Sequence, residues 1–283
     1  MSGRSALWWG SLEGADLVSL IVAAGASGFG EVSSTPAMYF DARNSGRSDA
    51  ELRTVLDDNG VVVSVVDPLL RGLPGACRPD KVGRRWRSTF EHGEDDCHVV
   101  ADALGASVIN VAHFLGEPTS IDELIDAIGS ITERATRRGR TVAIEAMPEG
   151  AIPDLSTALA IVRGVGNPLC GVTLDTWHWW RSGGRMDELE ALAPGDVLVL
   201  QVSDALRATR GSGTEPPDRD RLLPGSGEVP LVDLLRLVRA TSPNVHVGLE
   251  VFDAAAAGQP FGERAASAMC SLTELEQRAA LLS

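Results

Sequence analysis

The fold of this chain is decided by Val142-Ala-Ile-Glu-Ala, Val172-Thr-Leu-Asp-Thr, Val197-Leu-Val-Leu-Gln and Val247-Gly-Leu-Glu-Val. Each stretch is a short apolar run, typical of a buried strand, with one oxygen-bearing side chain near its end: Glu145, Asp175, Gln201 and Glu250. Their separations of 30, 26 and 49 residues match one strand-plus-helix unit each, with a long loop in the last. The carboxyl ends of parallel strands meet at one mouth of a barrel, so we expect the four side chains to converge there.

The same alternation of apolar strand and amphipathic helix runs through the whole chain. Strands are predicted at residues 6–9, 28–32, 61–66, 107–111, 142–145, 171–174, 197–202 and 245–250. Helices are predicted at residues 16–24, 48–58, 89–104, 120–138, 155–165, 186–192, 230–240 and 261–282. This count closes an α/β barrel without spare elements. Residues 1–283 are therefore expected to form one (β/α)8 TIM-barrel domain, for which about 250 residues are typical.

Composition and charge exclude several classes of function. A net charge of −14 argues against nucleic acid or an anionic membrane as partner, since both require a basic face. The chain has no apolar run of about 18 residues, and its start lacks the apolar region of a signal peptide. The cysteines lie far apart, which indicates reduced thiols. We expect a cytoplasmic protein whose partner is a small-molecule substrate; a homodimer is left open as the oligomeric state.

The predicted cluster at the barrel mouth points to a metal. Three carboxylates that converge in one place repel one another strongly unless a cation lies between them. One divalent cation bound by Glu145, Asp175, Gln201 and Glu250 is therefore the first hypothesis.

Two long loops follow strands on the same mouth, at residues 68–87 and 206–223. Barrel enzymes build substrate-binding loops there, although the second loop could equally be a solvated insertion. The first loop carries five arginines that we expect to contact either the acidic rim or an anionic substrate: Arg71, Arg78, Arg84, Arg85 and Arg87. The turn Gly225-Ser-Gly could offer N–H groups to a phosphate, but such turns are too common to decide the question.

Five segments in order carry a resemblance to a known family. They are Ile144-Glu-Ala-Met-Pro, Leu174-Asp-Thr-Trp-His-Trp-Trp, Leu200-Gln-Val-Ser-Asp-Ala, Leu223-Pro-Gly-Ser-Gly and Gly248-Leu-Glu-Val-Phe. The set resembles the xylose-isomerase-like barrel superfamily of sugar phosphate isomerases and epimerases, closely over residues 141–252 and elsewhere only by strand rhythm. The resemblance implies one metal bound by a Glu, an Asp, a His and a Glu after strands five to eight. By position these are Glu145, Asp175, Gln201 and Glu250.

The chain departs from that pattern at the third ligand. Gln201 replaces the expected histidine and makes the shell all-oxygen, which favours Mg²⁺, Mn²⁺ or Ca²⁺ over Zn²⁺. Mn²⁺ and Mg²⁺ are the cations that we expect first. A glutamine at this corner is also similar to some 3-dehydroshikimate dehydratases of the same superfamily, which are lyases. The metal is thus better defined than the reaction.

Further candidates surround the predicted metal. The resemblance implies that His178, three residues after Asp175, contacts substrate, and it could act as acid or base. Arg181 and Arg207 are candidates for holding a carboxylate or phosphate, with pairing to nearby acidic residues as the alternative. The tryptophans Trp8, Trp177 and Trp179 are predicted to line an apolar pocket, with barrel packing as the alternative.

These residues favour an isomerase or epimerase that acts on an enolisable α-hydroxycarbonyl, either sugar-like or a cyclic ketone. The cation would polarise the carbonyl, and Glu145, Glu250 or His178 would remove the neighbouring proton. A dehydratase would use the same groups, so the sequence leaves it as an alternative. A barrel that only binds a metabolite is the non-enzyme alternative. The phosphodiesterase chemistry of the endonuclease branch is disfavoured, because it needs a histidine-rich site and a basic face.

Overall fold

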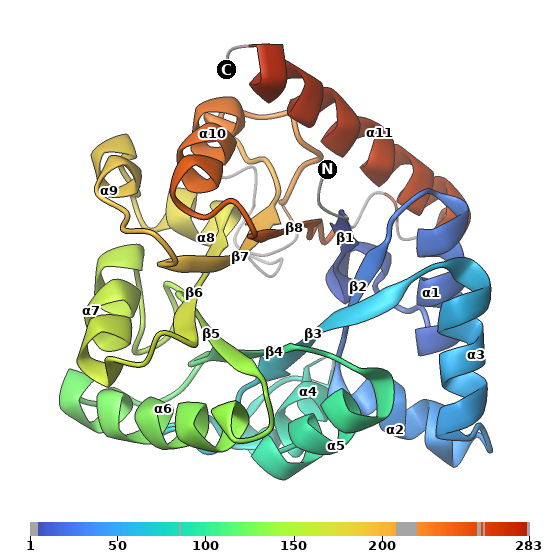
Figure 1. Cartoon of the computed structure of the whole chain (residues 1–283), viewed down its shortest axis with the longest axis horizontal. Coiled ribbons are helices and arrows are strands. Elements are labelled where there is room, and N and C mark those ends of the chain that lie inside the picture. The colour runs from blue at the N-terminus through green and yellow to red at the C-terminus, as the bar shows by residue number, and fades with distance from the viewer. Residues whose placement is uncertain (1–4, 85, 208–219, 254–255, 257, 282–283) are drawn as a thin grey trace.

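A closed barrel of eight parallel strands forms the centre of the computed structural model, which describes residues 5–84, 86–207, 220–253, 256 and 258–281 (Figure 1). The strands follow one another in chain order, and β1 pairs with β8 to close the ring. Their bounds are β1 Ala6–Leu7, β2 Glu31–Ser34, β3 Val62–Leu69, β4 Val108–Ala112, β5 Thr141–Glu145, β6 Cys170–Asp175, β7 Val197–Val202 and β8 His246–Leu249. The predicted fold class is confirmed, and each predicted strand coincides with an observed one to within a few residues.

Helices surround the barrel on its outer side (Figure 1). Their bounds are α1 Leu17–Ala26, α2 Pro36–Asn44, α3 Asp49–Asn59, α4 Arg87–Glu91, α5 Glu94–Leu104, α6 Ile121–Thr136, α7 Leu155–Val165, α8 Thr176–Arg181, α9 Met186–Glu190, α10 Leu231–Thr241 and α11 Phe261–Leu281; the 3-10 turns are η1 Trp9–Leu12 and η2 Pro79–Lys81. The single helix predicted over 89–104 is wrong, because His92 and Gly93 are extended and separate α4 from α5. Within the described part of the chain, no helix has the length and apolarity needed to cross a membrane.

Alternation along the strands sorts their side chains between two cores. In β5, Val142 and Ile144 pack outward against the helices, whereas Ala143 belongs to a separate small cluster that fills the barrel axis. Glu145, two residues further along, therefore shares the inward side with Ala143. The same period of two places Asp175, Gln201 and Glu250 on the inward side. All four predicted ligands thus lie on the inner side of the barrel.

The floor beneath these side chains is filled by Trp8, which is fully buried directly after β1. Its indole packs with Ala6, Val65 and Val199 in the axial cluster. A Cβ at Gly248 would lie 2.3 Å from a carbon of this ring, so the close approach of β8 requires glycine at that position. The axis is therefore solid, and a ligand can enter only from the carboxyl ends of the strands.

Candidate active site at the barrel mouth

The four predicted ligands meet at the mouth of the barrel. Glu145 and Asp175 are the last residues of β5 and β6, Gln201 lies near the end of β7, and Glu250 directly follows β8. All four are at most 4% exposed. Asp175 pairs in register with Gln201, and Gln201 pairs in register with Gly248, so the groups lie on neighbouring strands. The predicted convergence is therefore present in the structure.

A fourth carboxylate, Asp67 near the end of β3, extends the cluster across the barrel. The amide nitrogen of Asn110 donates to Asp67 Oδ1 at 2.6 Å and to Glu145 Oε2 at 2.7 Å. Thr173 Oγ1 donates to Asn110 Oδ1 at 2.6 Å and so fixes which end of the amide faces the acids. The indole N–H of Trp9 donates to the other oxygen of Asp67 at 2.8 Å. Asp67 is thus held by two donors, Asn110 and Trp9, that no pattern in the sequence connects.

Arg221 inserts a positive charge between two of the predicted metal ligands. Its Nη1 lies 2.6 Å from Asp175 Oδ2 and 3.6 Å from Glu250 Oε2, and its Nη2 lies 3.3 Å from His178 Nε2. The residue is only 3% exposed, and the rings of Trp177 and Phe252 flank its guanidinium at 5.1 and 5.5 Å. A strand-like bridge between Asp204 and Leu222 fixes the backbone beside it. Arg221 is therefore a built-in counter-charge for Asp175 and Glu250.

Gln201 has a fixed amide orientation because of Trp8 below it. An indole N–H can only donate, so the amide oxygen of Gln201 faces Trp8 Nε1 at 2.5 Å. The amide nitrogen then donates to Asp175 Oδ2 at 2.9 Å and to Glu145 Oε1 at 3.1 Å. In this orientation Gln201 presents hydrogens to the acids rather than an oxygen to a cation. The ligand role predicted for its oxygen would need the amide to rotate and break the bond to Trp8.

The charges of the cluster do not balance. Burial, and then the negative charges of Asp67 and Asp175, raise the pKa of Glu145 well above its ordinary value. Burial likewise raises the pKa of Asp67 to about 6, against the hydrogen bonds from Asn110 and Trp9. Burial would raise the pKa of Asp175 too, but the positive charge of Arg221 outweighs it and holds that pKa below its usual range. Arg221 thus compensates part of the negative charge of the cluster, mainly that of Asp175, while the pKa of Glu145 remains raised.

His178 lies beside Glu145 on the short helix α8, although the sequence predicted a loop there. Asp175 caps this helix by accepting from the backbone N–H groups of Trp177 and His178, which holds the imidazole over the cluster. His178 Nε2 lies 3.6 Å from Glu145 Oε1, and Nδ1 has no hydrogen-bond partner among the described residues. Burial lowers the pKa of His178 to about 4, with Arg221 adding to the effect against Asp175. The ring is therefore neutral at pH 7.

The donor set fits a divalent cation. Glu145, Asp175 and His178 each offer one ligand atom, and these atoms all lie within 4.8 Å of one another. Burial and the neighbouring carboxylates raise the pKa of Glu145, and a cation bound at this point would offset both effects. A cation at this point would be shared by two carboxylates and an imidazole, and it would compete with Arg221 for Asp175. The arrangement suggests a divalent metal with His178, rather than Gln201, nearest to the carboxylates.

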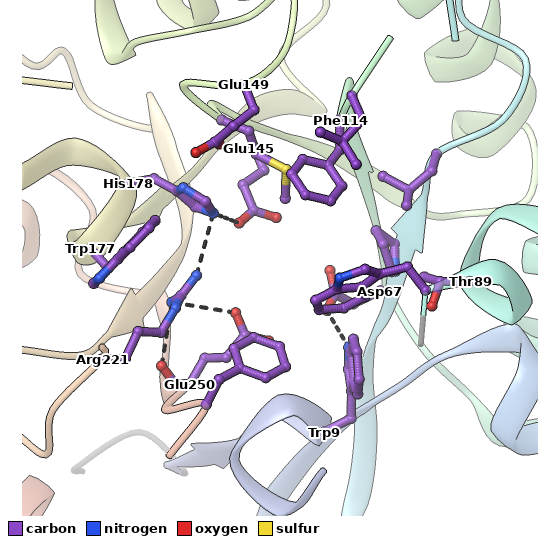
Figure 2. A pocket seen from close by; sticks show the side chains of 16 residues that line it. Trp9, Asp67, Thr89, Phe114, Glu145, Glu149, Trp177, His178, Arg221 and Glu250 are labelled. Carbon is purple, nitrogen blue, oxygen red and sulfur yellow. Dashed lines mark hydrogen bonds and ion pairs between the residues drawn. The ribbon is translucent and has the colours of Figure 1, made fainter. Parts of the chain in front are cut away.

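Above the cluster opens a cavity of about 220 Å³ (Figure 2). Figure 2 shows Asp67 and Trp9 on the side opposite Trp177, His178 and Arg221. The remaining wall is largely apolar, and its residues are Pro68, Leu70, Trp86, Thr89, Phe114, Leu115, Met147 and Phe252, with Glu149 at one side. Aromatic rings and ionisable groups therefore occur on both sides of the cavity.

The structure separates the predicted substrate-binding residues. Trp177 lines the cavity and donates its indole N–H to Asp220 at 2.9 Å. Trp8 lies in the barrel axis below the site, and Trp179 is buried against Gly184, so both belong to packing rather than to the cavity wall. Among the lining residues that the structure describes, neither Arg181 nor Arg207 appears, because Arg181 pairs with Asp220 and Arg207 stacks on Trp180 at 4.5 Å.

Several lining residues escaped the sequence prediction. Asp67 lies within β3 and directly follows the predicted strand 61–66, so a search for acidic residues at strand ends, as used for the other acids, would have found it. Trp9, Trp86 and Phe252 reach the cavity from three separate segments, and no pattern in the sequence joins them. Arg221 lies near the end of the second long loop, residues 206–223, where no periodicity indicates which way a side chain points. Residues 208–219 of that loop lie outside the described residues.

Comparison with known proteins agrees with this architecture. The model of the family described as "xylose isomerase-like TIM barrel" matches residues 18–272. An inosose isomerase of Halalkalibacterium halodurans is 24% identical over 159 residues, which cover 52% of this chain and 55% of that protein. The chain thus spans about half the length of this curated relative.

Solved structures show the same fold at low identity. A xylose isomerase-like TIM barrel/4-hydroxyphenylpyruvate dioxygenase fusion protein has a TM-score of 0.80 at 22% identity, covering 99% of this chain and 44% of that one. The IOLI protein with a binding zinc atom has a TM-score of 0.81 at 15% identity, covering 98% and 99%. A probable 3-DHS dehydratase of Bacillus anthracis has a TM-score of 0.71 at 16% identity, covering 95% and 98%.

Proposed function

Because the chain belongs to the xylose isomerase-like TIM barrel family, we propose that it is an isomerase or epimerase of an enolisable α-hydroxyketone that depends on one divalent cation. The observation that carries the proposal is the neutral imidazole of His178 placed 3.6 Å from Glu145 within a buried acidic cluster. Proton transfer requires one group that donates a proton and one group that accepts it. Surroundings that shift two pKa values in opposite directions produce such a pair. The inosose isomerase relative is consistent with this class of substrate.

Glu145, Asp175 and His178 would hold the cation, with Glu250 beside them. When bound, a divalent cation polarises the carbonyl of the substrate and makes the neighbouring C–H more acidic. We propose Mn²⁺ or Mg²⁺, because carboxylate oxygens outnumber nitrogen donors in the cluster. The zinc atom in the similar IOLI structure makes Zn²⁺ the cation to test against them.

Different side chains have different roles in the proton transfers. A carboxylate, Glu145 or Glu250, removes the α-proton from the face of the substrate that it meets. The neutral His178 can exchange hydrogen bonds with a substrate hydroxyl, because its lowered pKa keeps the ring uncharged at pH 7. Arg221 keeps Asp175 ionised throughout, since it bonds that carboxylate directly. The aromatic wall and Phe252 exclude water from the deprotonated substrate.

Exchange of the α-proton tests this proposal directly. We expect the Mn²⁺-loaded protein to incorporate deuterium from D₂O next to the carbonyl of inosose or of 2-hydroxycyclohexanone, followed by NMR. Glu145→Gln and His178→Asn should each slow exchange by a factor of about 100 or more, the range for loss of an acid–base group. Arg207→Gln serves as control, because that side chain lies outside the cavity. Equal exchange in all four proteins would contradict the proposal.

Dehydration is the second candidate, because two carboxyl groups, Glu145 and Glu250, reach the same cavity. One of them can remove the α-proton as a carboxylate, and a protonated group beside it can donate a proton to the departing β-hydroxyl. The structural likeness to a probable 3-DHS dehydratase shows the fold alone, so the reaction itself must be tested. Incubation with 3-dehydroshikimate separates the two candidates: growth of an absorbance from the dehydrated aromatic product indicates a lyase, and exchange without that product indicates an isomerase.

A further inference from the structure

Four of the aromatic rings that line the cavity form a box, to which the proposed function gives no role beyond the exclusion of water. Trp9 lies edge-to-face with Trp86 at 6.2 Å and with Phe252 at 5.6 Å, and Trp86 meets Phe252 at 5.7 Å. Phe114 adds a fourth ring at 6.2 Å from Trp86. The four come from η1, the segment before α4, the segment after β4 and the segment after β8. We call these four residues the aromatic box.

The aromatic box is part of the wall of the ligand cavity. Its four members line the cavity together with Glu145, His178 and Glu250. The indole N–H of Trp9 is fixed by Asp67, so that ring has a set orientation. Trp86 and Phe114 are half-buried, which leaves part of each ring open to what enters the cavity. A flat apolar group would be in contact with several rings at once.

The charged groups of the cavity disfavour a phosphate. Asp67, Glu145, Glu149 and Glu250 line the cavity, whereas Arg221 is the one arginine or lysine among the described lining residues. That guanidinium is already engaged with Asp175 and Glu250. A phosphate dianion would therefore enter a cavity with an excess of negative charge, even with one divalent cation bound.

The basic groups expected to hold an anion have other partners. Arg71 donates to the carbonyl oxygen of Glu91, and Arg78 pairs with Asp80. Arg84 and Arg87 are exposed and do not line the cavity, and Arg85 lies outside the described residues. The N–H groups of Gly225 and Gly227, a possible phosphate cradle by sequence, both donate to Asp204 Oδ2 at 2.9 Å. The described residues therefore offer no phosphate cradle at this mouth.

We propose that the substrate is an uncharged, phosphate-free molecule with two unlike ends, a hydroxyketone at the acidic cluster and a flat apolar ring in the aromatic box. The choice of which end is enolised rests on the proposed function. The cavity of about 220 Å³ admits a molecule of roughly one ring and a short side arm, since ordinary ligand pockets of about 300–1,000 Å³ hold larger ligands. The ring end supplies binding, while the acids and His178 act on the other end.

Binding measurements on the Mn²⁺-loaded protein test the substrate class. The probes are 2-hydroxyacetophenone, which carries a phenyl ring on a hydroxyketone, dihydroxyacetone, which lacks the ring, and dihydroxyacetone phosphate. Calorimetric titration should show the phenyl ketone binding at least tenfold more tightly than either other probe. Equal affinity for the phenyl ketone and dihydroxyacetone, or tighter binding of the phosphate, would overturn the proposal.

Two variants assign that preference to the aromatic box. Trp86→Leu and Phe114→Leu should each weaken the phenyl ketone at least fivefold and change dihydroxyacetone less than twofold. Trp180→Leu is the matched control, because this half-buried tryptophan lies outside the cavity and should leave both affinities unchanged. Equal weakening of both probes in the box variants would refute the role of the box.

The same data keep this inference separate from the proposed function, since binding needs no turnover. A clear phenyl preference without α-proton exchange in any ketone would refute the function and support the binding inference. Exchange of dihydroxyacetone without any phenyl preference would support the function and refute the inference.

Discussion

Arg221→Met removes the counter-charge of the acidic cluster while keeping an unbranched side chain of moderate length. Arg221 Nη1 lies 2.6 Å from Asp175, and both side chains are at most 2% exposed. Removing one partner of such a buried pair costs about 3–5 kcal/mol, because the remaining charge is left uncompensated. Glu250, 3.6 Å away, loses the same partner, so we expect the upper part of that range. The free energy of unfolding in EDTA should therefore fall by about 4–5 kcal/mol.

Added Mn²⁺ should recover much of this loss. A divalent cation between Glu145 and Asp175 supplies the positive charge that Arg221 supplied, and it no longer has a guanidinium to displace. Saturation at 100 times the dissociation constant stabilises a folded protein by about 2.7 kcal/mol. The variant should also bind Mn²⁺ more tightly than the parent, by tenfold or more in a calorimetric titration. Urea unfolding with and without Mn²⁺ gives the stability.

Arg264→Met is the matched control for this experiment. Arg264 is also buried, at 6% exposed, but the hydrogen bonds of its guanidinium go to the carbonyl oxygens of Ser11 and Glu13. Its removal should cost about 1–3 kcal/mol through lost hydrogen bonds, with no special recovery by Mn²⁺. If Mn²⁺ restores the Arg221 variant no more than the Arg264 variant, Arg221 and the cation do not share Asp175, and the proposed metal position is refuted.

Two further predictions concern Asp67 and Gln201. Burial raises the pKa of Asp67 in the folded protein to about 6 from its ordinary value of 3.8, so the parent should lose stability as pH rises from about 4 to 6, by roughly 3 kcal/mol at most. Asp67→Asn should flatten this part of the pH profile relative to the parent in urea unfolding. Parallel profiles would show that Asp67 ionises normally. Gln201→His should shift metal preference toward Zn²⁺ and Co²⁺ if residue 201 is a ligand, and an unchanged Mn²⁺ to Zn²⁺ ratio in competition titrations would place it outside the ligands.

The barrel was predictable because its evidence is local. The run Val197–Val202 is predicted and observed with the same bounds, and the inward positions of Glu145 and Asp175 follow from a period of two within each strand. Nothing beyond neighbouring residues is needed to place them at the mouth. The acidic part of the candidate site could therefore be predicted from the alternation of side chains along each strand.

The tryptophans show where this reasoning fails. Trp8 and Trp9 are adjacent, yet one fills the barrel axis and the other lines the cavity. β1 has only two residues, so its short pattern cannot indicate which side either tryptophan takes. Trp86 and Arg221 lie in long connections, where the direction of a side chain depends on contacts with distant segments. Their roles are properties of the assembled barrel and not of any stretch of sequence.

The contact between Trp8 and Gln201 links the packing of the barrel to the charge of its mouth. The indole N–H needs an acceptor, and the amide oxygen of Gln201 supplies it, so the amide nitrogen must face Asp175 and Glu145. A neutral histidine at this position would meet the same demand with one ring nitrogen and present an N–H to the acids with the other. The ligand role predicted for residue 201 therefore competes with the hydrogen bond from the tryptophan in the axis. Arg221 supplies positive charge to Asp175 and Glu250. In the proposed function, a cation near His178 supplies the rest.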